Sequence, residues 1–314
     1  SQRNRPGLLI ETHMLKPYRL RVNATYEVVL TTMEILAKEK MKLEILISQA
    51  DQFTSSDAFR DKPFPLSLET SRQDSVMREF LGYEYEIVKS DLTGGDWFQY
   101  SSKPAAFMLP YFSKAYPRHE TRLPLAYIIP AEWVAVLEVI SAHGFDRTIL
   151  KEETSIPVMR YRFKNPSWQQ MPYEGRHRIV RLDLEEFNET YAFPAGSVIV
   201  PIAQPDARII AHLLEPKGNG SLVQWGFFDA VFEQKEYGES YVVERMARLM
   251  IKDDPALLRE FEEKKRTDTV FAKNHWEMIN WFYRKSKFAD NRYMVYPVGR
   301  IFDEALLPEK TMKR

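Results

Sequence analysis

The pattern of apolar and polar positions predicts a short strand and two helices at the start of the chain. Residues 8–12 (LLIET) are a short apolar run of the kind that forms a buried strand. In residues 19–38 apolar side chains recur at intervals of three and four, which is the spacing of one face of an α-helix. That face consists of Val22, Tyr26, Val29, Leu30, Met33 and Leu36. Residues 41–55 continue as a second helix, and two prolines in 62–65 (KPFP) then end helical structure.

The next part of the chain has the pattern of β-strands. Residues 65–112 are predicted to be β-rich, and 78–88 alternate over their second half and contain several aromatic residues. Residues 92–96 (LTGGD) predict a turn. A further strand is expected at 125–129, followed by a helix that ends at Gly144, because glycine is the usual residue just past a helix.

The second half of the chain is predicted to change from strands back to helices. Residues 147–215 are expected to be entirely β, with short strands, including 208–214 (RIIAHLL), separated by Pro, Gly and Asn. Three helices are expected within 239–286, and Asp254 is the expected N-cap of the second, with proline at the first helical position. Residues 292–302 form one last predicted strand.

These elements predict a mixed α+β or α/β chain with a substantial β-sheet core. A length of 314 residues is enough for about two domains. The prolines near residue 60 mark the expected boundary between residues 1–60 and residues 61–314. The second part is β-rich at 65–112 and 147–215, and helical at 239–286.

Composition excludes several kinds of chemistry. Lys+Arg and Asp+Glu both number 44, so the net charge is zero, which argues against nucleic acid as a partner. The absence of cysteine excludes disulfides, thiolate metal sites and cysteine nucleophiles. No apolar run approaches the roughly 18 residues that a membrane span requires. The sequence contains neither a Gly-rich phosphate loop nor a G-x-S-x-G nucleophile motif.

Glu11 is the first candidate for a functional residue, since it is a carboxylate inside an apolar run. A carboxylate is almost never buried without a partner, so Glu11 is expected to be paired or to face a site from the end of a strand. His13, two residues later, lies on the same face of a strand and either pairs with Glu11 or points to the same cleft. From composition alone, a structural carboxylate is the simpler interpretation.

The run LLIETHMLKPY (8–18), with the helix after it, resembles the last catalytic strand and closing helix of the zinc carboxypeptidase family (carboxypeptidase A-like). Residues 123–133 (LPLAYIIPAEW), 193–216 (FPAGSVIVPIAQPDARIIAHLLEP) and 221–229 (SLVQWGFFD) are similar to segments in the long C-terminal extensions of bacterial members. The resemblance implies that Glu11 is the general base of a peptidase.

The resemblance also implies how the chain is organised. Residues 1–60 would be the C-terminal remnant of a carboxypeptidase α/β domain, and residues 61–314 a non-catalytic extension. The family's zinc ligands, a His-x-x-Glu pair and a later histidine, precede the glutamate strand, and residues 1–7 (SQRNRPG) contain none of them. We therefore expect zinc in the full-length enzyme, no metal in this chain, and no peptidase activity of this chain alone. The family implies a peptide substrate and a periplasmic or secreted location.

Two other interpretations stay open. His212 and Glu215 form the one His-x-x-Glu of the chain, and with His275 they would be the ligands of an independent zinc enzyme. Residues three apart on a predicted strand face opposite sides, which argues against that site. The other interpretation is a non-catalytic module that binds peptide or glycan through the β-rich extension. Apolar surface left exposed would favour a homo-oligomer.

Overall fold

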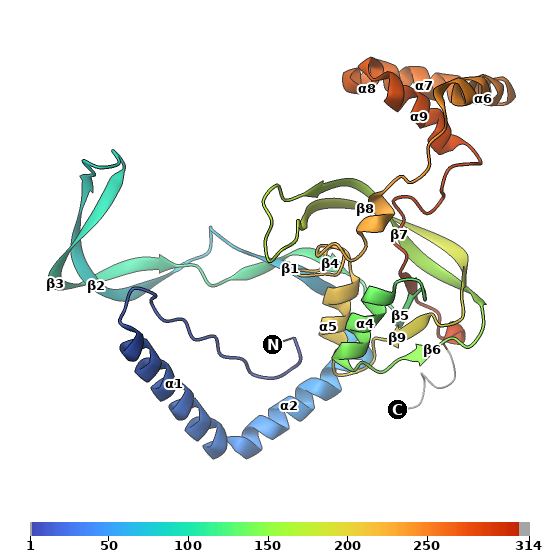
Figure 1. Ribbon diagram of the computed structural model, residues 1–314. Coiled ribbons are helices and arrows are strands. Elements are labelled where there is room, and N and C mark those ends of the chain that lie inside the picture. Colours follow the sequence, from blue (N-terminus) through green and yellow to red (C-terminus); the bar gives the residue numbers. More distant parts are fainter. Residues whose placement is uncertain (1, 308–314) are drawn as a thin grey trace. The chain divides into compact units, whose positions relative to one another are not determined.

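A computed structural model describes residues 2–307 and separates the chain into two units (Figure 1). Ser1–Lys62 and Leu123–Arg314 together form the first unit, and Pro63–Arg122 forms the second. The described residues contain nine α-helices and sheets of two to six strands, so the mixed α/β class predicted from the sequence is confirmed. The division into a catalytic remnant and an extension stays a prediction.

A six-stranded antiparallel sheet lies at the centre of the first unit. Its strand order is β6 (Thr148–Ile149), β9 (Val198–Pro201), β5 (Ala126–Ile129), β10 (Gly299–Ile301), β7 (Thr154–Trp168), β8 (Ile179–Phe193). Every residue of β5, β9 and β10 is buried. The sequences of β5 and β9 are short apolar runs, which is why they were recognisable as strands. The strand expected at 292–302 is confirmed only in its last part.

The sequence predicted one of two short helices of the first unit correctly and mistook the other for a strand. Helix α4 (Val134–His143) ends at Gly144, whose φ of 73° is left-handed, as the sequence predicts. Residues 208–214 were predicted to be a strand, and this is wrong: they belong to helix α5 (Ala207–Leu214). The buried residues of α5 recur at intervals of three and four, so burial of one helical face decides the structure here. They are Ala207, Ile210, Ala211 and Leu214.

Gly299 fills a place in the sheet core where no side chain fits. A Cβ atom there would lie 2.8 Å from both Ile128 Cγ2 and Val158 Cγ1, and 3.1 Å from Phe193 Cζ. These three residues belong to one buried cluster. The close contacts come from three different strands, so the neighbours cannot all move aside together.

Gly299→Ala is therefore expected to lower the free energy of unfolding by about 1–3 kcal/mol, the usual cost of overpacking a filled core. Urea unfolding followed by tryptophan fluorescence measures this loss. Gly7→Ala is the matched control, because a Cβ at Gly7 meets no atom within 4 Å. Equal stability of the two variants would contradict the prediction.

The helices predicted near the N-terminus are confirmed, but the strand before them is not. Helix α1 (Tyr18–Lys38) is followed by α2 (Lys40–Thr54) and the short α3 (Asp57–Arg60). The strand predicted at 8–12 is wrong, since residues 6–13 have no regular secondary structure. A strand needs a neighbour to bond its backbone groups, and none of the described strands lies beside this segment.

Four helices near the C-terminus form a cluster with an apolar core of its own. They are α6 (Ser240–Asp253), α7 (Pro255–Thr267), α8 (Thr269–Lys273) and α9 (His275–Lys285). The predicted N-cap Asp254 is confirmed, since its side chain accepts a hydrogen bond from the Ala256 backbone. The third predicted helix is divided, because the Asn274 side chain caps a new helix. Two 3₁₀ helices, η1 (Asp229–Phe232) and η2 (Glu304–Leu306), complete this unit.

The second unit consists of two antiparallel strand pairs. Strand β1 (Phe64–Thr70) pairs with β4 (Ala115–Thr121), and β2 (Val76–Lys89) pairs with β3 (Asp96–Tyr111) through the predicted turn at 92–96. The β2–β3 pairing is interrupted by a bulge, because Tyr83 pairs with Pro104 and Tyr85 with Tyr100. One residue of β2 therefore lies opposite three of β3, and such an insertion bends a hairpin.

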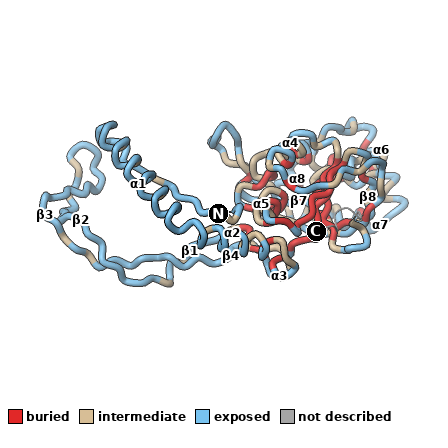
Figure 2. Tube along the Cα trace, turned by 90° about the horizontal axis from the view of Figure 1, so that it is seen from below, coloured by how far each residue is buried: buried red, intermediate tan, exposed pale blue. Residues whose placement is uncertain are grey.

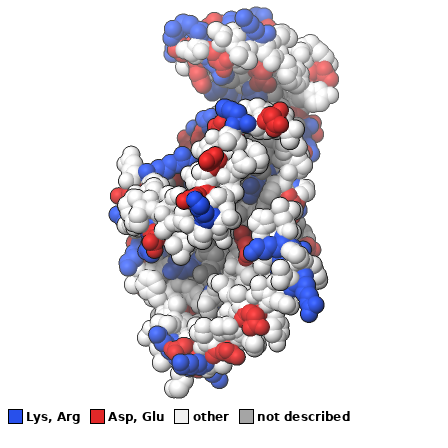
Figure 3. All heavy atoms as spheres, turned by 90° about the vertical axis from the view of Figure 1, so that its left-hand side faces the viewer, with Lys and Arg blue, Asp and Glu red and all other residues white. Residues whose placement is uncertain are grey.

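The surface carries both charges and contains wide uncharged areas. On the face in Figure 3, acidic and basic side chains lie side by side without one large region of a single sign. No helix in the described part of the chain is long and apolar enough to cross a membrane.

Candidate functional site

Glu11 and His13, the two N-terminal candidates, both lie in the irregular segment before α1 and are exposed. The Nδ1 atom of His13 accepts a hydrogen bond of 3.2 Å from the Leu15 backbone. Among the described residues, no hydrogen bond or ion pair joins Glu11 to His13. The carboxylate of Glu11 therefore faces solvent in this chain.

Residues 8–38, which we call the N-terminal arm, expose an unusual number of large apolar side chains. Helix α1 contains no buried residue, and Figure 2 shows it exposed along its length. Soluble proteins rarely leave a contiguous apolar surface of this size uncovered unless it is an interaction site. The exposed residues are Leu8, Leu9, Met14, Leu15, Tyr18, Leu20, Val22, Tyr26, Val28, Val29, Leu30, Met33, Ile35 and Leu36.

The far end of α2, in contrast, is anchored to the rest of the first unit. The Thr54 hydroxyl is buried and donates a 3.1 Å hydrogen bond to the Pro205 carbonyl. The side-chain amide of Asn4 donates to Thr54 Oγ1 at 2.9 Å and to the Pro205 carbonyl at 3.2 Å. The arm is thus attached through α2 while its own apolar face stays uncovered.

Glu215, the carboxylate of the His-x-x-Glu, is buried in an ion pair. One carboxylate oxygen lies 3.2 Å from Arg300 Nε and accepts a 2.8 Å hydrogen bond from the Tyr127 hydroxyl. The other accepts from the Tyr161 hydroxyl at 3.1 Å, and Arg300 also donates to Tyr161. Both charged side chains are only 1% exposed. Each carboxylate oxygen is therefore already occupied by donors from the chain itself.

Burial and pairing shift the pKa values of Glu215 and Arg300 in opposite directions. Burial raises the pKa of Glu215, while the charge of Arg300 and the hydrogen bonds from Tyr127 and Tyr161 act to lower it. Burial is the largest single influence on the pKa of Arg300 and lowers it, but Glu215, Tyr161, Tyr127 and Glu186 together raise it by more, so the net shift of this pKa is upward. With the guanidinium and two hydroxyl groups directed at the carboxylate, we assign the pair as ionised. The pair joins the end of α5 to β10 in the interior and is not an open site.

The structure does not gather His212, Glu215 and His275 into a metal site. His212 lies on α5 and is half-buried, and burial together with Arg208 lowers its pKa. His275 is the exposed first residue of α9. Within residues 2–307, no three His, Asp or Glu side chains lie close enough together to hold a metal ion. A zinc donor set is thus not found in the described residues.

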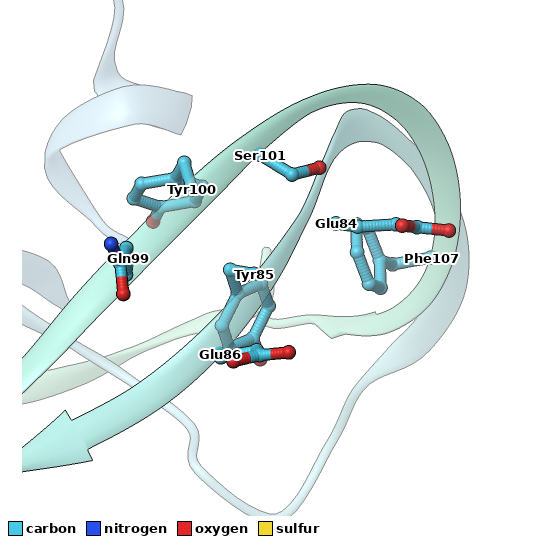
Figure 4. Close-up of a pocket in the computed structure, with 7 residues that line it drawn as sticks. All are labelled: Glu84, Tyr85, Glu86, Gln99, Tyr100, Ser101 and Phe107. Atoms are coloured by element: carbon cyan, nitrogen blue, oxygen red, sulfur yellow. The ribbon is translucent and has the colours of Figure 1, made fainter.

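The β2–β3 hairpin encloses a hollow of about 770 Å³ that the sequence did not indicate (Figure 4). Tyr85 lies at its centre, with ring centroids 5.8 Å from Tyr100 and 6.0 Å from Phe107. Its lining combines aromatic rings with two carboxylates and includes no Lys or Arg, a composition that favours a cationic group. The lining residues are Glu84, Tyr85, Glu86, Gln99, Tyr100, Ser101 and Phe107.

Sequence reasoning missed this hollow because the bend that creates it depends on the bulge. The aromatic alternation in 78–88 indicated a strand, but nothing in residues 101–103 indicated that they would lie opposite the single residue Glu84. The Nζ atom of Lys103 lies 3.6 Å from Oε2 of Glu84, one of the two carboxylates of the lining.

No family model, curated protein or solved structure matches this chain. The resemblance to zinc carboxypeptidases therefore rests on the quoted segments alone. Large apolar side chains are exposed on two surfaces, the N-terminal arm and the β2–β3 hairpin.

Proposed function

We propose that this chain is the C-terminal portion of a zinc-dependent metallocarboxypeptidase, with Glu11 as the general base. The observation that carries the proposal is the N-terminal arm, where an apolar run with one carboxylate leads into a 21-residue helix that buries nothing. An apolar segment and helix of this kind are stable when they complete a larger α/β domain, since burial of an apolar face supplies most of a helix's stability. A carboxypeptidase domain would supply that cover.

The proposal assigns one chemical role to this chain. The carboxylate of Glu11 accepts a proton from the attacking water and passes it to the leaving amine. The described residues do not fit a zinc ion, because no donor set is present. By the family resemblance, a His-x-x-Glu pair and a later histidine outside this sequence would hold the zinc, and the bound zinc would be the Lewis acid.

Two measurements test this proposal. The reading frame ahead of Ser1 should encode a His-x-x-Glu pair followed by a further histidine. The 314-residue chain should retain no stoichiometric zinc after extensive dialysis, whereas the chain extended by those residues should bind about one zinc ion. A reading frame without these histidines, or one zinc held by the 314 residues alone, would overturn the proposal.

A second function, a non-catalytic interaction module, is favoured by the hollow on the β2–β3 hairpin. If the hollow takes a small ligand, a basic tetrapeptide should change the fluorescence of Trp97, which lies on β3. A neutral oligosaccharide tests the glycan alternative in the same way. Tyr100→Ala should abolish either response, because Tyr100 lines the hollow. An unchanged response in that variant would place binding elsewhere.

A further inference from the structure

The β2–β3 hairpin is a two-stranded ribbon. A two-stranded ribbon is at best marginally stable in water, and a third strand or a covering element is needed. In the described residues β2 and β3 pair only with each other. Large apolar residues along both strands are exposed, and most of the ribbon is coloured as exposed in Figure 2. They include Val76, Met77, Phe80, Leu81, Tyr83, Tyr85, Ile87, Trp97, Phe98, Tyr100, Met108, Leu109 and Tyr111.

The free edge of β2 is the one suited to accept another strand. Its 14 residues contain no proline, so each residue whose N–H points away from β3 can donate to an added strand. The strand β3 contains Pro104 and Pro110, which cannot donate. A free edge that presents backbone donors and acceptors is a template for strand addition.

The charges of β2 are complementary to those of a second β2 strand that runs antiparallel to it. Arg78 and Glu86 lie at equal distances on either side of Gly82 in the sequence. If two copies of β2 pair antiparallel about Gly82, Arg78 of each lies opposite Glu86 of the other. Opposite residues in such a pair have Cβ atoms about 5 Å apart, close enough for an ion pair. Leu81 then lies opposite Tyr83, which joins two exposed apolar residues.

We propose that β2 pairs with β2 of a second copy of this chain across a two-fold axis at Gly82. Such an interface must be self-complementary, because the same surface is used by both copies. The pairing makes a four-stranded sheet from two marginal ribbons and so satisfies the need for additional strands. The zero net charge of the chain adds no long-range repulsion between copies.

The hollow of the hairpin contributes to the same contact. Glu86 lines it beside Tyr85 and Tyr100. In the proposed dimer the guanidinium of Arg78 from the second copy lies beside the Glu86 carboxylate, next to the rings of Tyr85 and Tyr100. Such a position is favourable for a cation. The inference specifies the partner of the interaction surface and does not depend on the peptidase proposal.

Sedimentation velocity of the full chain over a concentration series tests the proposal. The unaltered chain should dimerise, and Arg78→Glu should weaken dimerisation by about tenfold or more, because two attractive pairs become two repulsive ones. Glu86→Arg should do the same. The double variant R78E/E86R should restore the dimer, since the exchanged charges again lie opposite each other.

Arg72→Glu is the matched control, because it changes the net charge as R78E does but replaces an exposed residue that precedes β2. It should dimerise normally, and circular dichroism should show that all variants stay folded. A monomeric unaltered chain would overturn the proposal. So would a dimer unaffected by R78E, equal weakening by R72E, or a double variant that stays monomeric.

Discussion

Glu215→Ala is expected to destabilise the first unit by about 3–5 kcal/mol, because it leaves the guanidinium of Arg300 buried without its carboxylate. Arg300 is only 1% exposed, so water cannot replace the lost partner. The hydroxyls of Tyr127 and Tyr161 lose their acceptor in the same step. Urea unfolding followed by tryptophan fluorescence measures the loss.

A double variant separates the cost of an unpaired charge from the value of the ion pair. Glu215→Leu combined with Arg300→Met removes both charges and keeps similar volumes, and such replacements are often close to neutral. We therefore expect it to regain much of the stability that Glu215→Ala loses. Glu186→Gln is the control, since Glu186 lies 3.4 Å from Arg300 but its side chain is 60% exposed. A loss below about 1 kcal/mol for Glu215→Ala would show that Arg300 is compensated in another way.

The helices were largely predictable because their signals are local. In α6 and α7 the apolar spacing, the N-cap Asp254 and the proline after it all lie within a few residues of the helix ends. The error at α5 came from reading a short apolar run as a strand. The same run has apolar residues at helical spacing, and only the packing of that face decided between the two.

The segment at 8–12 shows the opposite limit. Its composition is that of a strand, but a strand forms only where a neighbour provides hydrogen bonds, and that neighbour is not encoded in the segment. The same reasoning applies to β2. The alternation of its residues predicted a strand, but not that one edge of that strand would lack a neighbour. Residues whose structure depends on a partner carry little local information about it.

The candidate site was predicted only in fragments. The sequence identified the His-x-x-Glu, but it did not reveal that Glu215 turns to Arg300, a residue far along the chain that reaches it through β10. The expectation that His212 and Glu215 lie on a strand was wrong, because His212 lies on α5 and Glu215 directly follows it. The hollow was missed because its shape depends on a bulge rather than on a motif.

Glu11→Gln is expected to reduce peptidase activity by about 10²–10⁴-fold in the chain extended by its zinc-binding residues, because glutamine cannot accept the proton that a general base removes. The loss should appear in kcat while the zinc content stays unchanged, since Glu11 is assigned no ligand role. Hydrolysis of a blocked dipeptide, followed with metal analysis of the same sample, measures both quantities.

Glu27→Gln supplies the matched control for Glu11→Gln. Glu27 is an exposed carboxylate on α1, so the two variants change the same charge in the same arm. Full activity of Glu27→Gln together with the loss in Glu11→Gln would tie the chemistry to one carboxylate rather than to the folding of the arm. Full activity of both variants would remove Glu11 from the reaction, while a loss of zinc in Glu11→Gln would make it a ligand instead of a base.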